Sequence, residues 1–564
     1  MSFNRKAPAY LAWVTNPNVD QDYKDELHNA SDEELLANFG TELEFGTAGI
    51  RGIMGAGPGR FNDFTIKKVT LALAQFLKQK PNIDLKQGVV IGHDNRYNSQ
   101  KFSQLVADIL SAEDIPSYLF PNNAMEPTPL ISFATKKLQA VAGVVITASH
   151  NPAIYNGYKI YNSEGCQLSE SETDQIAKNM ANLPDIMHWK FTPKPELIKI
   201  VPENIINDYD EMLDQLQFYP DETASKQDLK IVYSAVNGTG SAFTPRLLRK
   251  YGYTVIEVPE HSYEDPSFKN VGNPNPEFAP AWTLPLALAK KEQADLVIMN
   301  DPDADRIGIA VPNDCGDWIR LNGNETGPLL IDWKLSELAK AGLLPTNPAL
   351  YSSFVTSDLG DRIAAETYGA KIIKTLTGFK WMGGEIAKEP ERNLNFVFAY
   401  EESFGYVIDD STRDKDGIQA AIMVSELAWM AKTKFHKSLL DVLDDIYRKY
   451  GYYTTDTLNY NVKPEEKAEK LDPIMVNLRK HPPHELCGLK VVKVEDYLQG
   501  LFNMPSQNLM KFYLEDKSWI AVRPSGTEPK LKVYFVIVGD SPEDTKQKAE
   551  CISNAFKTKM QIKI

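Results

Sequence analysis

The chain has 564 residues, of which 43% are hydrophobic and 24% are charged, and its formal net charge is -15. These proportions are typical of a globular protein with an ample core, and the length predicts about four domains of ~150 residues each. The acidic balance argues against a nucleic-acid-binding protein, which needs a basic face, but it allows a local cationic pocket for an anionic ligand.

Four cysteines are spread over the sequence without a C-x-x-C pair: Cys166, Cys315, Cys487 and Cys551. This spacing indicates neither a zinc site nor a disulfide framework and is typical of a reducing cytosol. The N-terminal stretch turns polar too early for a signal peptide, and no apolar run reaches the ~18 residues of a membrane span. We expect a cytoplasmic protein that binds neither nucleic acid nor membrane and that needs no obligate protein partner.

Predicted helices and strands alternate along the chain. Ser31 and Glu34 form the pattern of a helix-capping box, and apolar residues recur with helical spacing over 64–79. This alternation predicts α/β domains with parallel or mixed sheets. In chain order we expect helices over 31–39 and 64–79, a strand over 88–94, a helix over 101–115, strands within 143–147 and 229–240, a helix over 244–252, strands within 253–258 and 294–311, a helix over 326–342, and strands within 349–355, 371–376 and 394–407.

Stretches rich in proline and charge mark the predicted domain boundaries. They include "KFTPKPELIKIVPENI", "VPNDCGDWIRLNGNE" and "NYNVKPEEKAEKLDPIM". We therefore expect four domains over 1–200, 201–318, 319–455 and 456–564, of which the last is the smallest.

One apolar strand ends in a serine and a histidine, in "GVVITASHNPAIYNGYKIY". Ser149 and His150 follow Val144 to Ile146, at the carboxyl end of a strand, where open α/β sheets place their ligands. Asn151 and Pro152 are also common turn residues for stereochemical reasons. By itself this stretch leaves both an ordinary turn and a catalytic loop open.

Three aspartates alternate in "NDPDADRIGIAV", between two apolar strands. Asp301, Asp303 and Asp305 repel one another unless a cation lies among them, and their all-oxygen donor set suits Mg²⁺ or Mn²⁺ better than zinc. An EF-hand is excluded because Arg306 occupies the glycine position of that motif and Pro312 its glutamate position. The alternative is a solvated acidic turn, which the flanking apolar strands make costly.

Two other stretches have a composition suited to binding an anion. "RPSGTEPK" offers the guanidinium of Arg523, the hydroxyls of Ser525 and Thr527, and backbone N–H groups beside Gly526. The alternative is a polar hairpin loop before an edge strand. In "EFGTAGIRGIMG", glycines surround Arg51, so that the backbone can approach an anion closely.

Two stretches late in the third predicted domain carry polar groups suited to a sugar. Glu401, Glu402 and Ser403 follow an apolar strand, and "KTLTGFKWMGG" is expected to expose Lys380 and Trp381 on a glycine-flanked loop, although a tryptophan more often packs within its own domain. Neither a Gly-Lys dipeptide nor a G-x-S-x-G motif occurs, which argues against a P-loop kinase and an α/β-hydrolase.

Together and in this order, "TASHNP", "DPDADR", "EESFG" and "RPSGTEPK" resemble the four signature loops of the α-D-phosphohexomutases, the phosphoglucomutase and phosphomannomutase superfamily. The resemblance covers residues 46–538, nearly the whole chain, and the first two motifs are highly specific as a pair. It implies four domains around a central cleft, three of them α/β with mixed sheets and a smaller α+β domain at the carboxyl end. It also favours the catalytic loop over the ordinary turn at Ser149.

The resemblance implies a role for each loop. Ser149 would carry the transferred phosphoryl group and join Asp301, Asp303 and Asp305 on one Mg²⁺. Residues expected in or near the transfer site, as donors or proton shuttles, are Arg51, His150, Lys159 and Lys380. Residues expected to bind the substrate are Gly378, Glu401 and Ser403 at the sugar hydroxyls, Arg306, and Arg523, Ser525, Gly526 and Thr527 at the phosphate that does not react.

The implied reaction is a phosphoryl transfer in two halves. A phosphoserine gives its phosphoryl group to a sugar hydroxyl, and the resulting bisphosphate turns around and returns its other phosphate to the serine. Glucose 1,6-bisphosphate is the expected activator, and a phosphosugar is the expected partner. The form of the metal and sugar loops favours glucose 1-phosphate and glucose 6-phosphate as substrates. Alternatives are a phosphopentomutase or phosphomannomutase and, less favoured, a phosphatase or a non-catalytic sugar-phosphate-binding protein.

Overall fold

The computed structural model describes residues 3–46, 49–462, 466–525 and 530–560. The chain divides into two compact units. Unit 1 comprises Met1–Gly323, Pro345–Ala349 and Gly378–Ser438, and unit 2 comprises Asn324–Leu344, Leu350–Thr377 and Leu439–Ile564. The three domain boundaries expected from the sequence stay predictions.

The first sheet of unit 1 is mixed, with the strand order β1-β5-β4-β2-β3-β6. Strands β2, β3, β4 and β6 run parallel to their neighbours in that group, whereas β5 and β1 are antiparallel to theirs. The strands are β1 (Gly49–Ile53), β2 (Val89–His93), β3 (Ser117–Leu119), β4 (Ala142–Ile146), β5 (Tyr155–Asn162) and β6 (Ile198–Ile200).

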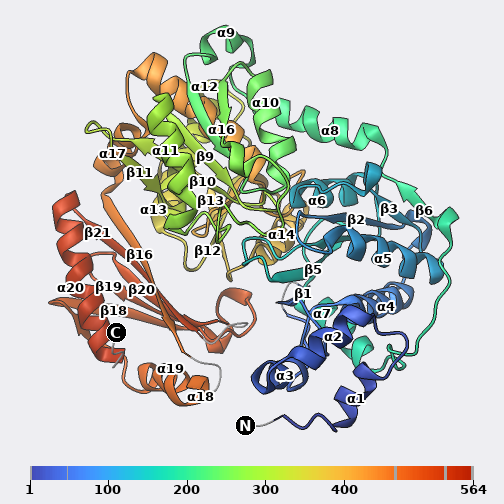
Figure 1. Ribbon diagram of the computed structural model, residues 1–564. Helices are drawn as coiled ribbons and strands as arrows, with labels where there is room; N and C mark the ends of the chain where they lie inside the picture. Colours follow the sequence, from blue (N-terminus) through green and yellow to red (C-terminus); the bar gives the residue numbers. More distant parts are fainter. Residues whose placement is uncertain (1–2, 47–48, 463–465, 526–529, 561–564) are drawn as a thin grey trace. The chain divides into compact units, whose positions relative to one another are not determined.

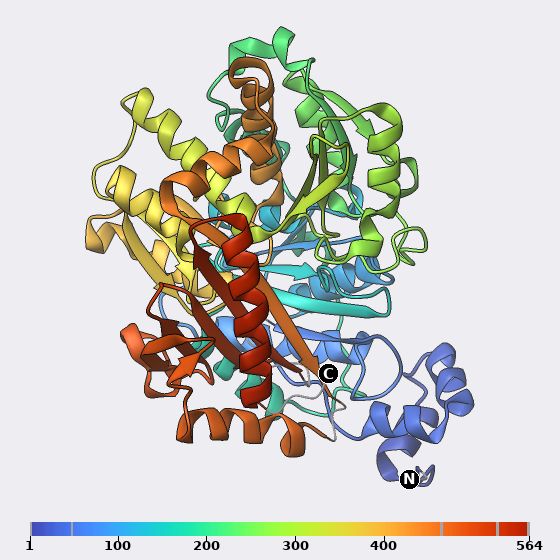
Figure 2. The ribbon, with the colours of Figure 1, turned by 90° about the vertical axis from the view of Figure 1, so that its left-hand side faces the viewer.

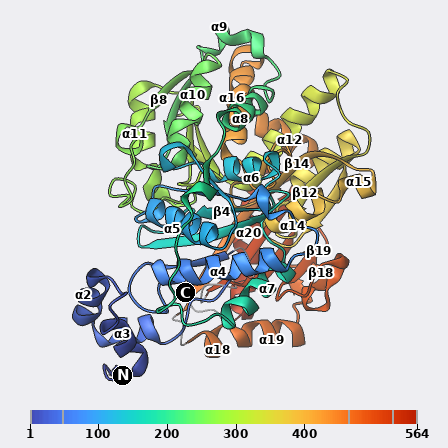
Figure 3. The ribbon, with the colours of Figure 1, turned by 90° about the vertical axis from the view of Figure 1, so that its right-hand side faces the viewer.

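Helices cover both faces of this sheet (Figures 1 and 3). On one face α4 (Asp63–Gln79), α5 (Ser99–Ala112) and α7 (Glu170–Ala181) share a core with alternate residues of β2, β4 and β5. Helix α6 (Thr128–Lys137) packs on the other face. Apolar side chains of both helices and strands are thereby removed from water, which is the main driving force for this layered arrangement.

A small helical module precedes the first sheet. It consists of α1 (Pro8–Val14), α2 (Gln21–Asn29) and α3 (Asp32–Phe39), which pack around Trp13 and Leu27. The capping box predicted at the start of α3 is confirmed: the Ser31 hydroxyl accepts from the Glu34 N–H, and the Glu34 carboxylate accepts from the Ser31 N–H. Two otherwise unpaired backbone donors of the first turn and cap are thereby satisfied.

The second sheet of unit 1 is also mixed and has the order β11-β10-β9-β7-β8. Its strands are β7 (Lys230–Ser234), β8 (Thr254–Glu257), β9 (Leu296–Asn300), β10 (Ile307–Pro312) and β11 (Trp318–Leu321). Strands β9 and β10 pair antiparallel with Asn300 opposite Ile307. The three alternating aspartates therefore lie on the loop of a β-hairpin, between two strands as predicted.

The third α/β region is divided between the units. Unit 1 holds the antiparallel hairpin of β14 (Asn395–Glu401) and β15 (Gly405–Val407), with α14 (Phe379–Ile386) and the buried α16 (Gly417–Met430). Unit 2 holds most of β12 (Pro348–Ser353), with β13 (Lys371–Thr375), α13 (Asp358–Arg362), α17 (Leu439–Tyr450) and most of α12 (Gly323–Lys340).

The carboxyl-terminal part of unit 2 is an antiparallel sheet with the order β16-β21-β20-β19-β18-β17. Helices α19 (Asp472–Lys480) and α20 (Pro542–Met560) bury their apolar sides against one face, and Figure 2 shows α20 lying along it. The strands are β16 (Tyr452–Asn461), β17 (Glu485–Leu486), β18 (Leu489–Asp496), β19 (Met510–Leu514), β20 (Trp519–Pro524) and β21 (Lys530–Gly539). The predicted fold class, three mixed α/β sheets and a smaller α+β carboxyl-terminal domain, is confirmed.

The cysteines depart from expectation. Cys487 and Cys551 form a disulfide, with their Cα atoms 5.9 Å apart. Cys551 lies on α20 and Cys487 follows β17, so packing of the helix on the sheet brings together two residues whose distance in sequence carries no pairing information. The expectation of no disulfide was wrong. None of the helices in the part of the chain that the structure describes combines the length and the apolar composition that crossing a membrane needs.

Candidate functional site

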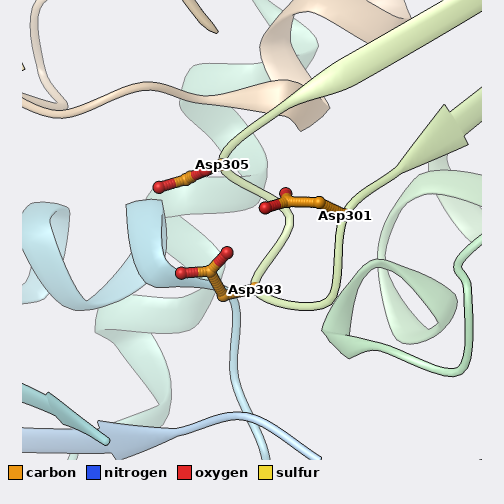
Figure 4. Close-up of side chains that lie close together, drawn as sticks. All are labelled: Asp301, Asp303 and Asp305. Atoms are coloured by element: carbon orange, nitrogen blue, oxygen red, sulfur yellow. The ribbon is translucent and has the colours of Figure 1, made fainter. Parts of the chain in front are cut away.

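The hairpin between β9 and β10 gathers three carboxylates in unit 1. Oxygens of Asp301, Asp303 and Asp305 lie within 4.8 Å of one another, and all three side chains are buried. Figure 4 shows the carboxylates turned toward a common space. Ala304, at φ 54°, adopts the left-handed conformation that gives this loop its tight turn.

The charges of this acidic triad are only partly compensated by the protein. Burial and then the neighbouring Asp303 and Asp305 raise the pKa of Asp301 well above its ordinary value. Burial alone would raise the pKa of Asp305 too, but Lys159 and Lys415 outweigh it and hold that pKa low. Among the described residues, Asp303 Oδ1 and Asp305 Oδ1 are buried without a hydrogen-bond partner. Unpartnered carboxylate oxygens that converge in this way fit a hard divalent cation.

Ser149 meets this triad from the first sheet. Its Oγ donates to Asp301 Oδ2 at 2.8 Å and lies 3.2 Å from His150 Nδ1. Ser149 is 1% exposed and has φ 52°, a strained conformation for a non-glycine residue. Burial, together with the cations Arg306 and Arg51, lowers the pKa of His150 well below its ordinary value, which favours the neutral imidazole.

Two buried lysines face the triad. Lys159 Nζ, on β5, lies 2.7 Å from Asp303 and 3.1 Å from Asp305. Burial alone would lower the pKa of Lys159, but the two carboxylates raise it above its ordinary value. Lys415 Nζ lies 3.1 Å from both Asp305 and Asp414. Lys159 was predicted at the site, whereas Lys415 was not.

Arg306 connects the triad to the predicted sugar loop. Its backbone N–H donates to Asp301, and its Nη1 donates to the Ser403 carbonyl at 3.1 Å. Glu401 accepts from the Gly378 N–H at 2.5 Å. Burial and the neighbouring Glu402 raise the pKa of Glu401 to about 7. The structure therefore brings all four of these predicted substrate-binding residues (Gly378, Glu401, Ser403 and Arg306) into one connected group.

Arg51 lies at the centre of strand β1, and its Nη1 donates to Asn151 at 3.2 Å. Gly49, at φ 132°, is needed there because a Cβ atom would overlap the Tyr158 carbonyl as β1 approaches β5.

The stretch "KTLTGFKW" was expected to be a loop but begins helix α14 immediately after Gly378. Lys380 pairs with Glu170 at 3.3 Å, and its Nζ lies 4.6 Å from the centre of the Trp381 ring. These are its partners among the described residues, so the structure does not join Lys380 to Ser149 or to the acidic triad.

The predicted phosphate loop belongs to unit 2 and connects β20 to β21. Arg523 pairs with Lys532 across these strands, and its Nε is buried without a hydrogen-bond partner among the described residues. The Ser525 N–H donates to the Lys530 carbonyl at 2.8 Å. Gly526 and Thr527 lie outside the described residues. The strand that follows, β21, pairs antiparallel with β20, as the hairpin alternative expected. It lies between β16 and β20, so the edge-strand part of that alternative is wrong.

Sequence reasoning missed several residues that organise the site. Thr128 Oγ1, at the start of α6, donates to Asp303 at 3.0 Å, and Glu277 lies 3.4 Å from Arg306 Nη1. The stretch "RDKDG", which contains Lys415, offered a signal because it places a lysine between two aspartates just before the apolar helix α16. Thr128 and Glu277 offered none.

Family models match nearly the whole chain. The models described as "Phosphoglucomutase/phosphomannomutase, alpha/beta/alpha domain I", "domain II" and "domain III" match residues 42–186, 207–316 and 322–450. The model of the family's C-terminal domain matches residues 459–552.

Individual proteins agree with these matches. A phosphoglucomutase of Staphylococcus aureus (strain USA300) is 34% identical over 551 residues, which cover 95% of this chain and 97% of that protein. The open form of pp63/parafusin, a phosphoglucomutase from Paramecium, has a similar fold, with a TM-score of 0.69, 19% identity and coverage of 92% and 95% of the two chains. A phosphoglucomutase/phosphomannomutase family protein from Burkholderia thailandensis gives a TM-score of 0.65, with 18% identity and coverage of 91% and 97%.

Proposed function

The chain belongs to the phosphoglucomutase/phosphomannomutase family, and from this premise we propose that it is a phosphoglucomutase that interconverts glucose 1-phosphate and glucose 6-phosphate. Its activity is that of a phosphohexomutase, an isomerase of carbohydrate metabolism. The observation that carries the proposal is the buried Ser149 hydroxyl, 2.8 Å from the acidic triad on a separate loop. A hydroxyl held there is suited to carry a phosphoryl group.

In the proposed reaction, the bond between Ser149 Oγ and phosphorus breaks while a sugar hydroxyl forms its own bond to phosphorus, and the proton that this hydroxyl loses ends on Ser149 Oγ. In the return step, Oγ forms a bond to the other phosphorus of the bisphosphate while the bond between that phosphorus and the sugar oxygen breaks. Neutral His150 accepts the Ser149 hydroxyl proton through Nδ1, which lies 3.2 Å away, and gives it to the released sugar oxygen. Lys159, held by two carboxylates, orients the loop and supplies positive charge near the transferring group. Phosphoryl transfer depends mainly on such positioning and charge compensation.

Asp301, Asp303 and Asp305, with the phosphate of Ser149, would hold one Mg²⁺. Bound there, the ion would neutralise the negative charge that develops on the transferred phosphoryl oxygens. The donor set supports this assignment, because it consists of oxygens alone and two of them are buried without a hydrogen-bond partner among the described residues.

The remaining predicted residues are proposed to bind the substrate or to take part in the transfer step. Arg306, Glu401, Ser403 and Gly378 are assigned to the sugar, Arg51 and Lys380 to the transfer step, and Arg523, Ser525, Gly526 and Thr527 to the phosphate that does not react. Glucose 1,6-bisphosphate is the proposed activator, because it can phosphorylate Ser149 directly. Two separate phosphate-binding groups are what a bisphosphate that turns around requires.

We also propose a cytoplasmic location, by analogy with the bacterial phosphoglucomutases that the chain resembles. The Cys487–Cys551 disulfide argues against it, because a reducing cytosol keeps thiols reduced. Cell fractionation with trapping of free thiols tests both statements: recovery outside the cytoplasm would overturn the proposed location.

Ser149→Ala tests the function. The wild-type protein, incubated with glucose 1,6-bisphosphate, should gain the mass of one phosphoryl group, and the variant should gain none. Loss of the covalent intermediate should lower the mutase rate at least ~1000-fold, with little change in thermal stability. Ser225→Ala is the matched control and should behave as wild type, because the Ser225 hydroxyl bonds to Glu222 and to no other residue in the part of the chain that the structure describes.

The substrate is tested with a panel of hexose, pentose and aminosugar 1-phosphates. A preference for glucose 1-phosphate supports the proposal. A preference for a pentose would make the protein a phosphopentomutase, and release of inorganic phosphate without isomerisation would make it a phosphatase. Wild-type rates in Ser149→Ala would overturn the role of the serine.

A further inference from the structure

The loop that carries Ser149 is held by a buried arginine from the neighbouring strand. Arg96 follows β2, is 3% exposed, and lies beside the loop in the same sheet. Its Nη2 donates to the Ser149 carbonyl at 2.6 Å and to the Asn151 carbonyl at 2.5 Å. Its Nη1 donates to the Pro152 carbonyl at 2.8 Å and to the Tyr155 carbonyl at 2.9 Å. One guanidinium therefore binds four backbone carbonyls of a single loop.

Asp94 completes this arrangement from the other side. Its carboxylate lies 3.2 Å from Arg96 Nε and accepts from the Thr147 hydroxyl at 2.6 Å. The Thr147 hydroxyl in turn accepts from the Ser149 N–H at 2.7 Å. The backbone of Ser149 is thus bound at both ends, its N–H through Thr147 and its carbonyl through Arg96.

This double attachment accounts for the conformation of Ser149. A serine at φ 52° is strained, and such strain persists only where the surrounding structure imposes it. A planar guanidinium with a fixed fork of donors suits this purpose, whereas a lysine has a single donor head on a flexible stem. The ring of Phe268, fully buried, lies 5.3 Å from the Arg96 guanidinium carbon and supports it from the loop after β8.

We propose that Arg96 is the positioning residue of the phosphoryl-transfer loop, which fixes the strained backbone of Ser149 and thereby aims Oγ at the acidic triad. This inference rests on the proposed function, because it takes Ser149 as the phosphorylated residue. Arg96 itself is assigned no contact with substrate.

The main experiment compares Arg96→Ala and Arg96→Lys with the wild type. A displacement of the loop by about 1 Å should lower kcat ~100-fold in Arg96→Ala. The KM should change less than about threefold, because substrate-binding residues lie on other loops. The kcat of Arg96→Lys should lie between those of Arg96→Ala and the wild type. Guanidinium ion at non-denaturing concentration should raise the kcat of Arg96→Ala at least about tenfold and should leave the kcat of the wild type unchanged.

Lys226→Met is the matched control. Lys226 is a buried cation of the same unit, is paired with Glu426 and is distant in sequence from the Ser149 loop. This variant should lose thermal stability, keep kcat per folded molecule within about threefold, and gain nothing from guanidinium. If Arg96→Ala does not fold, Phe268→Leu removes the supporting ring and should still lower kcat about fivefold without a matching rise in KM.

Hydrogen exchange of backbone amides over residues 147–156 gives a readout that needs no activity, and it should accelerate in the Arg96 variants. If the wild type takes up no phosphoryl group at Ser149, the proposed function fails. Hydrogen exchange would then still test whether Arg96 fixes the backbone of the Ser149 loop. The inference would be overturned by unchanged hydrogen exchange in the Arg96 variants. It would also be overturned if their loss of activity equalled the loss of folded protein and added guanidinium restored none of it.

Discussion

Each unit holds a cluster of buried or half-buried carboxylates and lysines, and only one of the two clusters has the features of a site. In unit 1 the cluster comprises Asp301, Asp303, Asp305, Lys159 and Lys415. In unit 2 it comprises Asp358, Asp361, Lys374 and Lys511. Both combine burial with shifted pKa values, the features by which sites are commonly sought.

The clusters differ in how their oxygens are partnered. In unit 2, Lys374 lies 2.5 Å from Asp361 and 3.3 Å from Asp358, and the other carboxylate oxygens accept from the Ser352 hydroxyl and the Trp519 indole. In unit 1, Asp303 and Asp305 each keep one buried oxygen without a hydrogen-bond partner among the described residues, and the Ser149 hydroxyl lies beside the triad. Buried charge alone therefore does not distinguish a site from a structural network. Converging carboxylate oxygens that accept no hydrogen bond, beside a hydroxyl, make that distinction.

The largest expected effect is that of Asp301→Asn. Loss of one carboxylate from the proposed Mg²⁺ site should lower kcat/KM about 1000-fold, or ~4 kcal/mol. Stability at neutral pH should hold or rise, because Asp303 and Asp305 disfavour the Asp301 charge. Steady-state kinetics against Mg²⁺ concentration, together with thermal unfolding, measure both. Wild-type activity that survives a strong chelator would contradict the assignment.

Lys374→Met is the complementary change in unit 2. It leaves Asp358 and Asp361 without their shared cation, so the free energy of unfolding should fall by about 3 kcal/mol, the low end for a broken buried pair because Lys374 is partly exposed. Activity per folded molecule should stay as in the wild type. Denaturant unfolding measures the loss, and an activity loss beyond the folded fraction would mean that the second cluster also serves the reaction.

Lys415→Met probes a residue that the sequence did not single out. Removal of its charge from Asp305 should lower kcat/KM about 100-fold, or ~2.7 kcal/mol, the range for one lost electrostatic donor at a reacting site. Lys415→Arg should recover part of the rate. Equal activity in wild type and Lys415→Met would show that Lys159 alone compensates the triad.

The smallest effect concerns pH and Lys511. Burial lowers the pKa of Lys511 to about 8. The nearby charge of Asp358 raises this pKa and that of Lys374 lowers it, and Glu495 and Asp361 also raise it. Its unfolded pKa is about 10.4, so between pH 8 and 10.4 the unfolded chain binds more protons than the folded one, and this group makes the folded state more stable as pH rises. From pH 7.5 to 9 the gain should be about 1 kcal/mol. Denaturant unfolding of Lys511→Met should lack this gain, and equal pH slopes in both proteins would contradict it.

Local patterns carried most of the successful predictions. The capping box at Ser31, the helix at α4 and the aspartate hairpin all follow from residues within a few positions of one another. One error also arose locally: the stretch around Lys380 was expected to be a glycine-flanked loop, but Gly378 caps a helix there, whereas the glycines around Arg51 permit close strand pairing. Glycine permits both arrangements, so its presence does not choose between them.

The sequence by itself determined that three carboxylates share one short loop and that a hydroxyl ends a buried strand, because alternation and strand periodicity are local properties of the backbone. Only the tertiary structure decided what faces them. Lys159 reaches Asp303 across 144 positions, and Arg96 reaches the Ser149 carbonyl across 53. Such contacts depend on the order of strands in the sheet, and the local periodicity of hydrophobic residues does not predict that order.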